Sequence, residues 1–386
     1  MAKLSKEDSV QSSLVNLART LGPNAKLPRV AELCTRLTVS RSTLDRVLRK
    51  LKADRTLFCR RGAGIFVSPL STQRRIGVVF DKYFYGQQEF SEFWGLLHGA
   101  ILQIGQDNRD DIRTYFGYPG KDDGQQGAFA LKDDLETRPL SGILTIGLLD
   151  AQAFEWLKTW NVPLISMGAG FDLSHAGVIF NEDQCITKAL GALQGEGCKN
   201  IAIAYHTGED EMFEEETDPL SLSYRKYCAG SGLSYSAANR WTRRILPPQF
   251  ASKQFEEIGA QMIRQEVIAK PLNERPDGIF FHDDCMAHGG LIELLKGGIV
   301  PGRDIPIVAL SNKGASILRP FNSSIIRVDI DPMEVAQALF KLLAKSLAGE
   351  RVRSRLHKIN PSLRLPNPPP IHSLAPAETS QVSANI

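Results

Sequence analysis

The sequence predicts an α/β protein with a small, basic, mostly helical domain at the N-terminus and a larger region of two lobes, each built on a parallel sheet. Two observations carry this prediction. Positive charge is concentrated in the first part of the chain, where three helices and a hairpin can be recognised. In the remainder, apolar strands alternate with helices, which is typical of parallel sheets covered on both faces.

Charge divides the chain into two parts. Residues 1–75 contain 16 Lys and Arg against 5 Asp and Glu. Of the totals of 46 and 43, this leaves 30 basic and 38 acidic residues in the rest of the chain. Such asymmetry indicates that one end meets a polyanion and the rest does not. Because Lys and Arg release counterions when they contact phosphates, DNA binding by this segment should depend strongly on salt.

The basic segment predicts three helices. The first covers residues 5–21 and ends at the helix-breaking pair Gly22 and Pro23. The second covers residues 27–37. The third begins after the N-cap residue Ser40 and carries an apolar stripe at helical spacing, namely Leu44, Val47, Leu48 and Leu51. The cations of this helix lie off the stripe, so it should pack on the first two helices and leave the cations exposed.

A hairpin is expected after the third helix. The β-prone runs TLFC and IFVS flank RRGAG, whose Gly62 and Gly64 permit a tight turn. Three helices and a basic hairpin make a winged helix-turn-helix, in which the third helix enters the major groove of DNA by its N-terminal end. The residues expected to contact DNA are Ser40, Arg41, Ser42, Thr43 and Arg46 on the helix, and Arg60, Arg61 and Gly62 in the wing. Arg29, at the start of the second helix, either contacts phosphate or is solvated.

This segment resembles the DNA-binding domain of the GntR family. Residues 27–67 read LPRVAELCTRLTVSRSTLDRVLRKLKADRTLFCRRGAGIFV, which keeps the LP, VSR-x-T and G-x-G-x-FV signatures of that family at closely similar spacing. Two positions depart from it: Asp45 stands where relatives often have Arg, and Arg29 opens a tripeptide that is often Ser-Glu-Arg. Asp45 lies one turn from both Arg41 and Arg49, so it either pairs with them or accepts from a cytosine amino group. The base preference of relatives therefore does not transfer.

The rest of the chain is expected to form the two lobes. Strand-like runs occur in RRIGVVFD, DIRTYFG, LSGILTIG, VPLISMG, NIAIAYH, PDGIFFH, DIPIVALS and IIRVDI, with helix-like runs between most of them. Nearly 300 residues exceed what one such sheet usually holds. The expected organisation is a DNA-binding domain at 1–70, a linker at 71–75, a core at 76–365 and a disordered tail at 366–386. Within the core, one lobe takes about 76–180 and 329–350, and the other about 181–328 and 351–365.

This second region resembles the effector-binding core of LacI-type regulators, which is related to periplasmic binding proteins. The resemblance is carried by segments in conserved order that include VPLISMG, SYRKYCAG, PDGIFFHDDCMAHGGL, IPIVALSN and IIRVDIDPMEVAQALFKLL. A GntR-type reader joined to such a core is similar to the arabinose repressor group of Gram-positive bacteria. The resemblance implies a cytoplasmic, homodimeric transcription regulator, acting as a repressor, that binds a double-stranded DNA operator and responds to a sugar or sugar derivative.

A two-lobed core of this kind binds its ligand at the carboxyl ends of the strands, in the cleft between lobes. Read together with the resemblance, this rule selects Asp81 and Tyr83, after the first strand, and Asn181, where the chain should cross between lobes. The resemblance implies four further effector-binding positions, namely Arg225, Trp241, Asp283 and Ser311. Each has a structural alternative, such as packing for Trp241. Asp284 is expected to cap the helix that follows it.

An enzyme is the competing interpretation, because His282, Asp283 and Asp284 form a group suited to metal binding or acid–base chemistry. The spacing of six between His282 and His288 is not the spacing of four that places two histidines on one helix face. The sequence shows neither a phosphate-binding glycine loop nor a G-x-S-x-G nucleophile motif. A purely architectural DNA-binding protein, the third interpretation, would not need the large core. No cofactor or metal is expected.

The remaining composition indicates a soluble, reducing environment. The six cysteines include no close pair, which fits neither a zinc site nor a disulfide framework. No apolar run approaches the roughly 20 residues of a membrane helix, and the N-terminal residues lack the apolar run of a secretory signal. We therefore expect a cytoplasmic protein with reduced thiols and no membrane partner.

Overall fold

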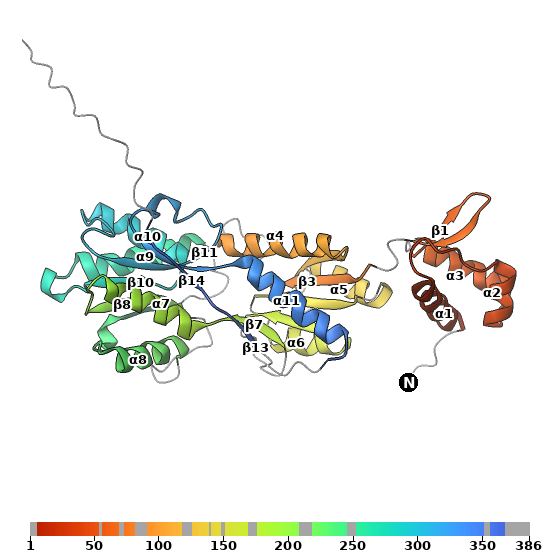
Figure 1. The fold of residues 1–386 in the computed structure, drawn as a ribbon, viewed down its shortest axis with the longest axis horizontal. Coiled ribbons are helices and arrows are strands. Elements are labelled where there is room, and N and C mark those ends of the chain that lie inside the picture. The colour runs from red at the N-terminus through yellow and green to blue at the C-terminus, as the bar shows by residue number, and fades with distance from the viewer. Residues whose placement is uncertain are drawn as a thin grey trace, which may run out of the picture. The chain divides into compact units, whose positions relative to one another are not determined.

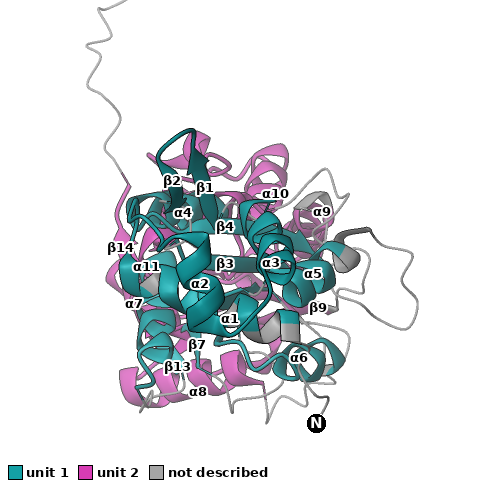
Figure 2. Ribbon diagram, turned by 90° about the vertical axis from the view of Figure 1, so that its right-hand side faces the viewer, with its two compact units in different colours: residues 1–85, 98–179, 335–357 teal, residues 86–97, 180–334, 358–386 magenta. Residues whose placement is uncertain are grey.

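The computed structural model describes residues 6–53, 56–68, 73–81, 91–117, 126–138, 140–147, 151–168, 176–207, 218–244, 252–350 and 356–366. The chain forms two compact units (Figure 2). Unit 1 contains residues 1–85, 98–179 and 335–357, and unit 2 contains residues 86–97, 180–334 and 358–386. Within the described ranges, no helix is long and apolar enough to cross a membrane. The predicted linker at 71–75 is described only from residue 73 onward, and of the predicted tail only residue 366 is described.

The N-terminal domain, counted with unit 1, consists of three helices and a hairpin (Figure 1). These elements are α1 (Lys6–Leu21), α2 (Val30–Leu37), α3 (Arg41–Ala53), β1 (Leu57–Arg60) and β2 (Gly64–Val67). All five contribute to one hydrophobic core, which contains the complete predicted stripe of α3. The winged helix-turn-helix predicted from the sequence is confirmed.

The segment before α2 is extended, although the sequence predicted that the second helix would begin at residue 27. The Leu27 N–H donates to the Ile65 carbonyl over 2.9 Å, and Lys26 forms an antiparallel bridge with Phe66. Pairing with the wing therefore holds this segment in an extended conformation. The prediction was wrong here because a contact nearly 40 residues away along the chain outweighs local propensity.

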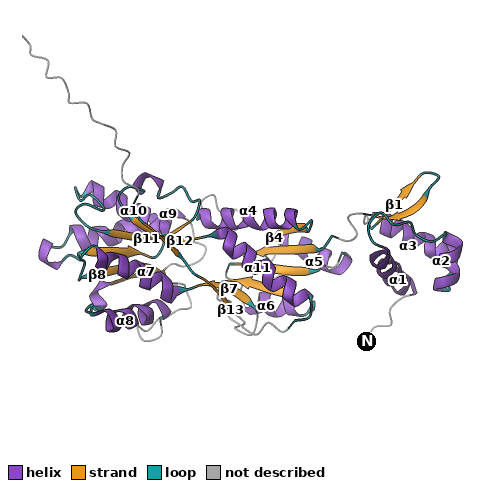
Figure 3. Cartoon of the chain, in the orientation of Figure 1, coloured by secondary structure: helices purple, strands orange, loops and turns teal. Residues whose placement is uncertain are grey.

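Unit 1 contains most of a six-stranded sheet with the order β13-β7-β6-β5-β3-β4. Figure 3 draws the strands in orange and the helices in purple. The strands are β3 (Arg75–Phe80), β4 (Asp111–Phe116), β5 (Gly142–Ile146), β6 (Leu164–Met167), β7 (Gly177–Phe180) and β13 (Leu356–Ile359). Strands β3 to β7 pair with one another in parallel. The helices of this part of the chain are α4 (Glu92–Asp107), α5 (Gln126–Thr137), α6 (Ala151–Lys158) and α11 (Pro332–Leu347).

Unit 2 contains the second sheet, with the order β14-β12-β11-β10-β8-β9. Its strands are β8 (Ile201–Thr207), β9 (Arg240–Arg244), β10 (Gly278–Phe281), β11 (Ile307–Asn312), β12 (Ile326–Ile330) and β14 (Ser362–Arg364). All pair in parallel except β14, which is antiparallel to β12. The helices are α7 (Glu182–Gly195), α8 (Pro219–Ser231), α9 (Ser252–Ile263) and α10 (Asp284–Lys296), with short helical turns at Ala237–Asn239, Arg264–Ile268, Leu272–Glu274 and Arg319–Phe321. The predicted pair of mainly parallel sheets is confirmed.

Two glycines fix the position of α10 against α9. A Cβ atom at Gly259 would lie 1.9 Å from the Met286 carbonyl oxygen, and one at Gly289 would lie 1.9 Å from the Glu256 carbonyl oxygen. These are backbone atoms that cannot rotate away, so only glycine permits this close crossing of the two helices. Asp283, a predicted ligand residue, lies at the start of α10, shortly after strand β10.

Candidate DNA-binding and ligand-binding sites

The N-terminus of α3 is built by Ser40, as predicted. The Ser40 hydroxyl accepts from the Thr43 N–H over 3.2 Å and lies 2.9 Å from the Thr43 hydroxyl and 3.0 Å from the Ser42 hydroxyl. Thr38, in the turn from α2, has a left-handed backbone with φ of 53°. The three hydroxyls therefore form a polar cluster at the positive end of the helix, where N–H groups favour phosphate.

The three arginines of α3 differ in their partners. The Arg41 side chain is 83% exposed, and its Nε lies 3.9 Å from the Asp45 carboxylate. Arg49 instead donates to the Asp45 backbone carbonyl. Arg46 forms a 2.9 Å ion pair with Glu7 of α1. Among the arginines of α3, Arg41 therefore has only a long ion pair within its own helix, whereas Arg46 is paired with the first helix.

The wing presents a second set of cations. Gly62 adopts φ of 76° and Gly64 φ of 118°, which are conformations that favour glycine and close the hairpin. Arg60 and Arg61 are both exposed, and the guanidinium of Arg60 lies over the rings of Phe58 and Phe66. Arg29, the residue before α2, is exposed and its side chain makes no capping hydrogen bond. Its contact with phosphate stays a prediction.

In unit 2, strand β10 ends at the start of α10, and Asp283 links them. The Asp283 carboxylate accepts from the Met286 N–H over 2.8 Å, so Asp283 is the N-cap of α10. The prediction that Asp284 caps this helix was wrong, because the strand ends one residue earlier than the capping assignment required. Asp284 is the first residue of the helix and is 3% exposed.

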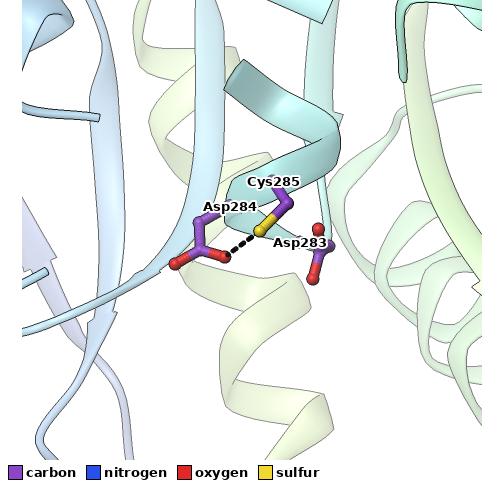
Figure 4. A group of neighbouring side chains, drawn as sticks. All are labelled: Asp283, Asp284 and Cys285. Atoms are coloured by element: carbon purple, nitrogen blue, oxygen red, sulfur yellow. Dashed lines mark hydrogen bonds between the residues drawn. The ribbon is translucent and has the colours of Figure 1, made fainter. Parts of the chain in front are cut away.

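Asp284 takes part in a separate network. Its carboxylate accepts from the Asn312 amide over 2.9 Å and lies 3.6 Å from the Cys285 sulfur. Figure 4 shows the Asp284 and Asp283 side chains directed to opposite sides of the start of α10. Burial, together with the negative charge of Asp283, raises the pKa of Asp284 to about 7.

A carboxylate–imidazole pair lies at the same edge of the sheet. The Glu182 carboxylate of α7 is 2.7 Å from Nε2 of His282, which follows β10. Burial opposes charge on His282, but the Glu182 carboxylate outweighs it and raises the imidazole pKa above its ordinary value. The same pairing lowers the pKa of Glu182 despite burial. The sequence analysis did not select Glu182, because 100 residues separate it from its partner.

Ser311 is a predicted ligand residue that lies inside the fold. It is 1% exposed, lies opposite Asp329 in the β11–β12 pair, and its hydroxyl has no hydrogen-bond partner among the residues that the structure describes. Ala309, two residues earlier on the same strand face, packs in the hydrophobic core together with α10 residues. Strand alternation therefore directs the Ser311 hydroxyl toward the α10 side of the sheet.

The other predicted ligand residues have varied surroundings. Asn181 precedes α7, and its amide donates to the Asn360 side chain over 2.7 Å. Asp81 follows β3 of unit 1 and is 5% exposed. The guanidinium carbon of Arg225 lies 5.0 Å from the Tyr235 ring centre. Trp241 is buried in the hydrophobic core of unit 2, which is the packing alternative. Tyr83 lies outside the described residues, and ligand binding by the whole set stays a prediction.

The competing enzymatic group is held by structural contacts. Atoms of Asp283, Asp284 and Cys285 lie within 4.8 Å of one another. Burial raises the pKa of the Cys285 thiol, whereas a metal would require the thiolate. Asp283 caps α10, Asp284 is hydrogen-bonded to Asn312 and His282 is paired with Glu182, so each member of the predicted group has a partner within the fold.

Comparison with known families decides the nature of the N-terminal domain. Residues 16–67 match the family described as bacterial regulatory proteins, gntR family. The chain carries a gntR-family helix-turn-helix. Residues 190–365 match the periplasmic binding protein-like domain, so both resemblances predicted from the sequence are confirmed. No curated protein matches the sequence.

Solved structures of LacI-type regulators share the fold. The transcription regulator CcpA of Lactococcus lactis aligns with a TM-score of 0.56 at 13% identity, over 75% of this chain and 97% of that chain. The complex of the transcriptional regulator CelR with cellobiose aligns with a TM-score of 0.57 at 14% identity, over 87% and 98%. A LacI family regulator from Arthrobacter sp. FB24 in complex with lactose aligns with a TM-score of 0.55 at 15% identity, over 76% and 98%.

Proposed function

We propose that the protein is a transcription regulator, acting as a repressor, whose affinity for a DNA operator changes when its core binds a sugar or sugar derivative. It acts in the cytoplasm as a homodimer, so that two winged domains read two half-sites on one face of the DNA. The observation that carries the proposal is the union of a gntR-family helix-turn-helix with a periplasmic binding protein-like domain in one chain.

The exposed N-terminus of α3 supports specific DNA binding. Ser40, Ser42 and Thr43 offer hydroxyls beside the first N–H groups of the helix, and Arg41 is exposed next to them. Hydroxyls and N–H groups suit phosphate contacts, while an arginine reads guanine by two parallel hydrogen bonds. The proposed docking therefore separates positioning, by the hydroxyl cluster, from base recognition, by Arg41.

The edge of the unit 2 sheet supports a ligand rich in hydroxyl groups. Asp283 and Asn312 bring acceptors to this edge, and the buried Ser311 hydroxyl has no hydrogen-bond partner in the part of the chain that the structure describes. A sugar both donates and accepts hydrogen bonds, so it can satisfy groups of each kind. We assign Asp283 and Ser311 as the first contacts to test. Two solved structures of this fold are complexes with cellobiose and with lactose, which makes saccharides the first ligands to screen.

Selection of DNA duplexes tests the proposal. The full chain is used to enrich duplexes from a pool of randomised sequences, with Arg41→Ala as the test variant and Arg303→Ala as a matched control. Arg303 is 70% exposed and lies in unit 2. We expect wild type and the control to enrich the same two-fold symmetric motif, and Arg41→Ala to lose it. Enrichment of no motif by wild type, or turnover of a screened saccharide, would contradict the proposal.

A thermal-shift screen of monosaccharides and disaccharides on the same protein tests the second half of the proposal. Any ligand that binds the folded state alone raises the unfolding temperature by mass action. We expect at least one saccharide to do so, and we expect Asp283→Ala to remove the shift. A saccharide shift that survives in this variant would place the ligand elsewhere.

A further inference from the structure

The wing carries an aromatic pair on the face opposite its hydrophobic core. Phe58 of β1 and Phe66 of β2 are direct cross-strand partners, and their ring centres lie 5.7 Å apart with an angle of 30° between the planes. Their neighbours Leu57 and Val67, on the other face, are buried at 1% and 0% exposure. The two phenylalanines therefore lie outside this core and are only partly buried.

Arg60 is stacked on this pair. It follows Phe58 by two residues and so shares its strand face. Its guanidinium carbon lies 5.4 Å from the Phe58 ring centre and 5.1 Å from the Phe66 ring centre, within the range of cation–π attraction. The adjacent Arg61 is exposed and has no ring contact or ion pair within the part of the chain that the structure describes. The side chains of Arg60 and Arg61, adjacent in one hairpin, therefore differ in conformational freedom.

A guanidinium that is already stacked should bind DNA with a smaller loss of entropy than a mobile one. Ordering a long side chain on binding costs rotamer entropy, and contact with a second surface before binding reduces that cost. The planar guanidinium can keep its ring contacts while its edge donates hydrogen bonds, which an ammonium group cannot do in the same geometry. The aromatic pair therefore orients Arg60 rather than neutralising it.

We infer that Phe58 and Phe66 are positioning residues that hold Arg60 for insertion into the DNA minor groove beside the sequence read by α3. The narrow minor groove of A-tracts concentrates negative potential and attracts inserted arginines. The wing then contributes a preference for A·T-rich flanks in addition to general affinity, while Arg61 contributes charge alone. This inference rests on the proposed function, because it requires that the chain binds DNA.

Two duplexes test the inference with the full chain. Both contain the motif enriched by wild type, one flanked by A-tracts and the other by alternating G·C pairs, and binding is measured by fluorescence anisotropy. We expect wild type to prefer the A-tract duplex. Arg60→Lys keeps the charge and should reduce this preference by about threefold to tenfold. Arg61→Lys, the matched control, should leave it unchanged.

Variants of the rings separate positioning from stability. Phe58→Leu with Phe66→Leu keeps apolar bulk and removes both π faces, so it should reduce the preference as Arg60→Lys does. Phe58→Tyr with Phe66→Tyr keeps both rings, so this variant should retain the wild-type preference for the A-tract duplex. If the stack has only a structural role, the leucine variant will have a lower unfolding temperature, but the ratio of its affinities for the A-tract and G·C duplexes will equal that of wild type. Because Arg60→Lys alters an exposed residue, it tests the inference even where the leucine variant fails to fold.

The outcomes distinguish the inference from the proposed function. If wild type enriches a motif but Arg60→Lys retains the wild-type flank preference, or if Arg61→Lys loses it equally, the inference is overturned and the proposed function stands. If wild type prefers neither flank, the inference is likewise overturned. If wild type enriches no motif, the proposed function falls and the inference falls with it.

Discussion

Truncating Leu44 to alanine should destabilise the DNA-binding domain selectively. Leu44 is fully buried, and the hydrophobic core that contains it consists of residues between Val10 and Val67. Removing a buried leucine side chain costs about 2–5 kcal/mol. A domain of about 60 residues has a total stability of about 3–9 kcal/mol, so with central values of both ranges the variant loses roughly half of it. The expected fall in unfolding midpoint is roughly 10–30 °C.

Differential scanning calorimetry of the full chain, combined with DNA-binding titration, measures this effect. Leu21→Ala is the matched control, because Leu21 ends α1 and is 39% exposed. Its cost should stay below about 1 kcal/mol. We expect Leu44→Ala to lose DNA binding while the transition of the remaining chain is retained. Equal midpoints and equal DNA affinities for the two variants would refute the packing of α3 described above.

Three further predictions follow from the sites. Arg41→Ala should weaken binding to the enriched duplex by about 1–3 kcal/mol with an unchanged circular dichroism spectrum, and unchanged affinity would reject the docking of α3. The Glu182–His282 pair is fully charged between the ordinary pKa of glutamate, 4.5, and that of histidine, 6.5. Its stabilisation is lost as pH rises through the raised His282 pKa, so Glu182→Gln should lower the free energy of urea unfolding by about 1–2 kcal/mol at about pH 6 and by less at about pH 9. An equal loss at both pH values would contradict this assignment. Arg225→Ala should abolish the saccharide response while preserving ligand-free DNA affinity, and a variant that still responds at the wild-type concentration would make the stack of Arg225 on Tyr235 structural.

The sequence was sufficient for elements defined by local pattern. The apolar stripe of α3 and its Ser40 cap follow from spacing and side-chain chemistry within one helix, and both were confirmed. The predicted strands with long apolar runs, such as β3 and β8, were also found. These features need no information from distant parts of the chain, because helical periodicity and capping are local.

Elements that depend on distant partners were missed. Strand β9 reads RWTRR and has a single apolar residue, so its pattern does not resemble a strand. It forms at the edge of the sheet beside β8, where charged side chains are tolerated. Helices α5 and α9 and strands β7, β13 and β14 were also not predicted.

The chemistry of the ligand edge shows the same limit. Asp284 was predicted to cap α10, but Asp283 does so. The difference is a shift of one residue in where β10 ends and α10 begins, which propensity does not resolve. The pairing of Glu182 with His282 requires the relative placement of α7 and β10, which only the folded sheet supplies. The residue types in the sequence were enough to select this region as a candidate site. The hydrogen-bond partners of its charged side chains could be identified only from the structure.

The most direct test of the central claim is a DNA titration of the full chain with and without saturating saccharide. The enriched duplex serves as the probe, and the saccharide is one that raises the unfolding temperature. Because coupling between two sites is reciprocal, we expect the saccharide to change the dissociation constant for DNA by about fivefold or more, and DNA to change saccharide affinity by the same factor. A protein that binds both, with a DNA dissociation constant unchanged by saturating saccharide, would contradict the account.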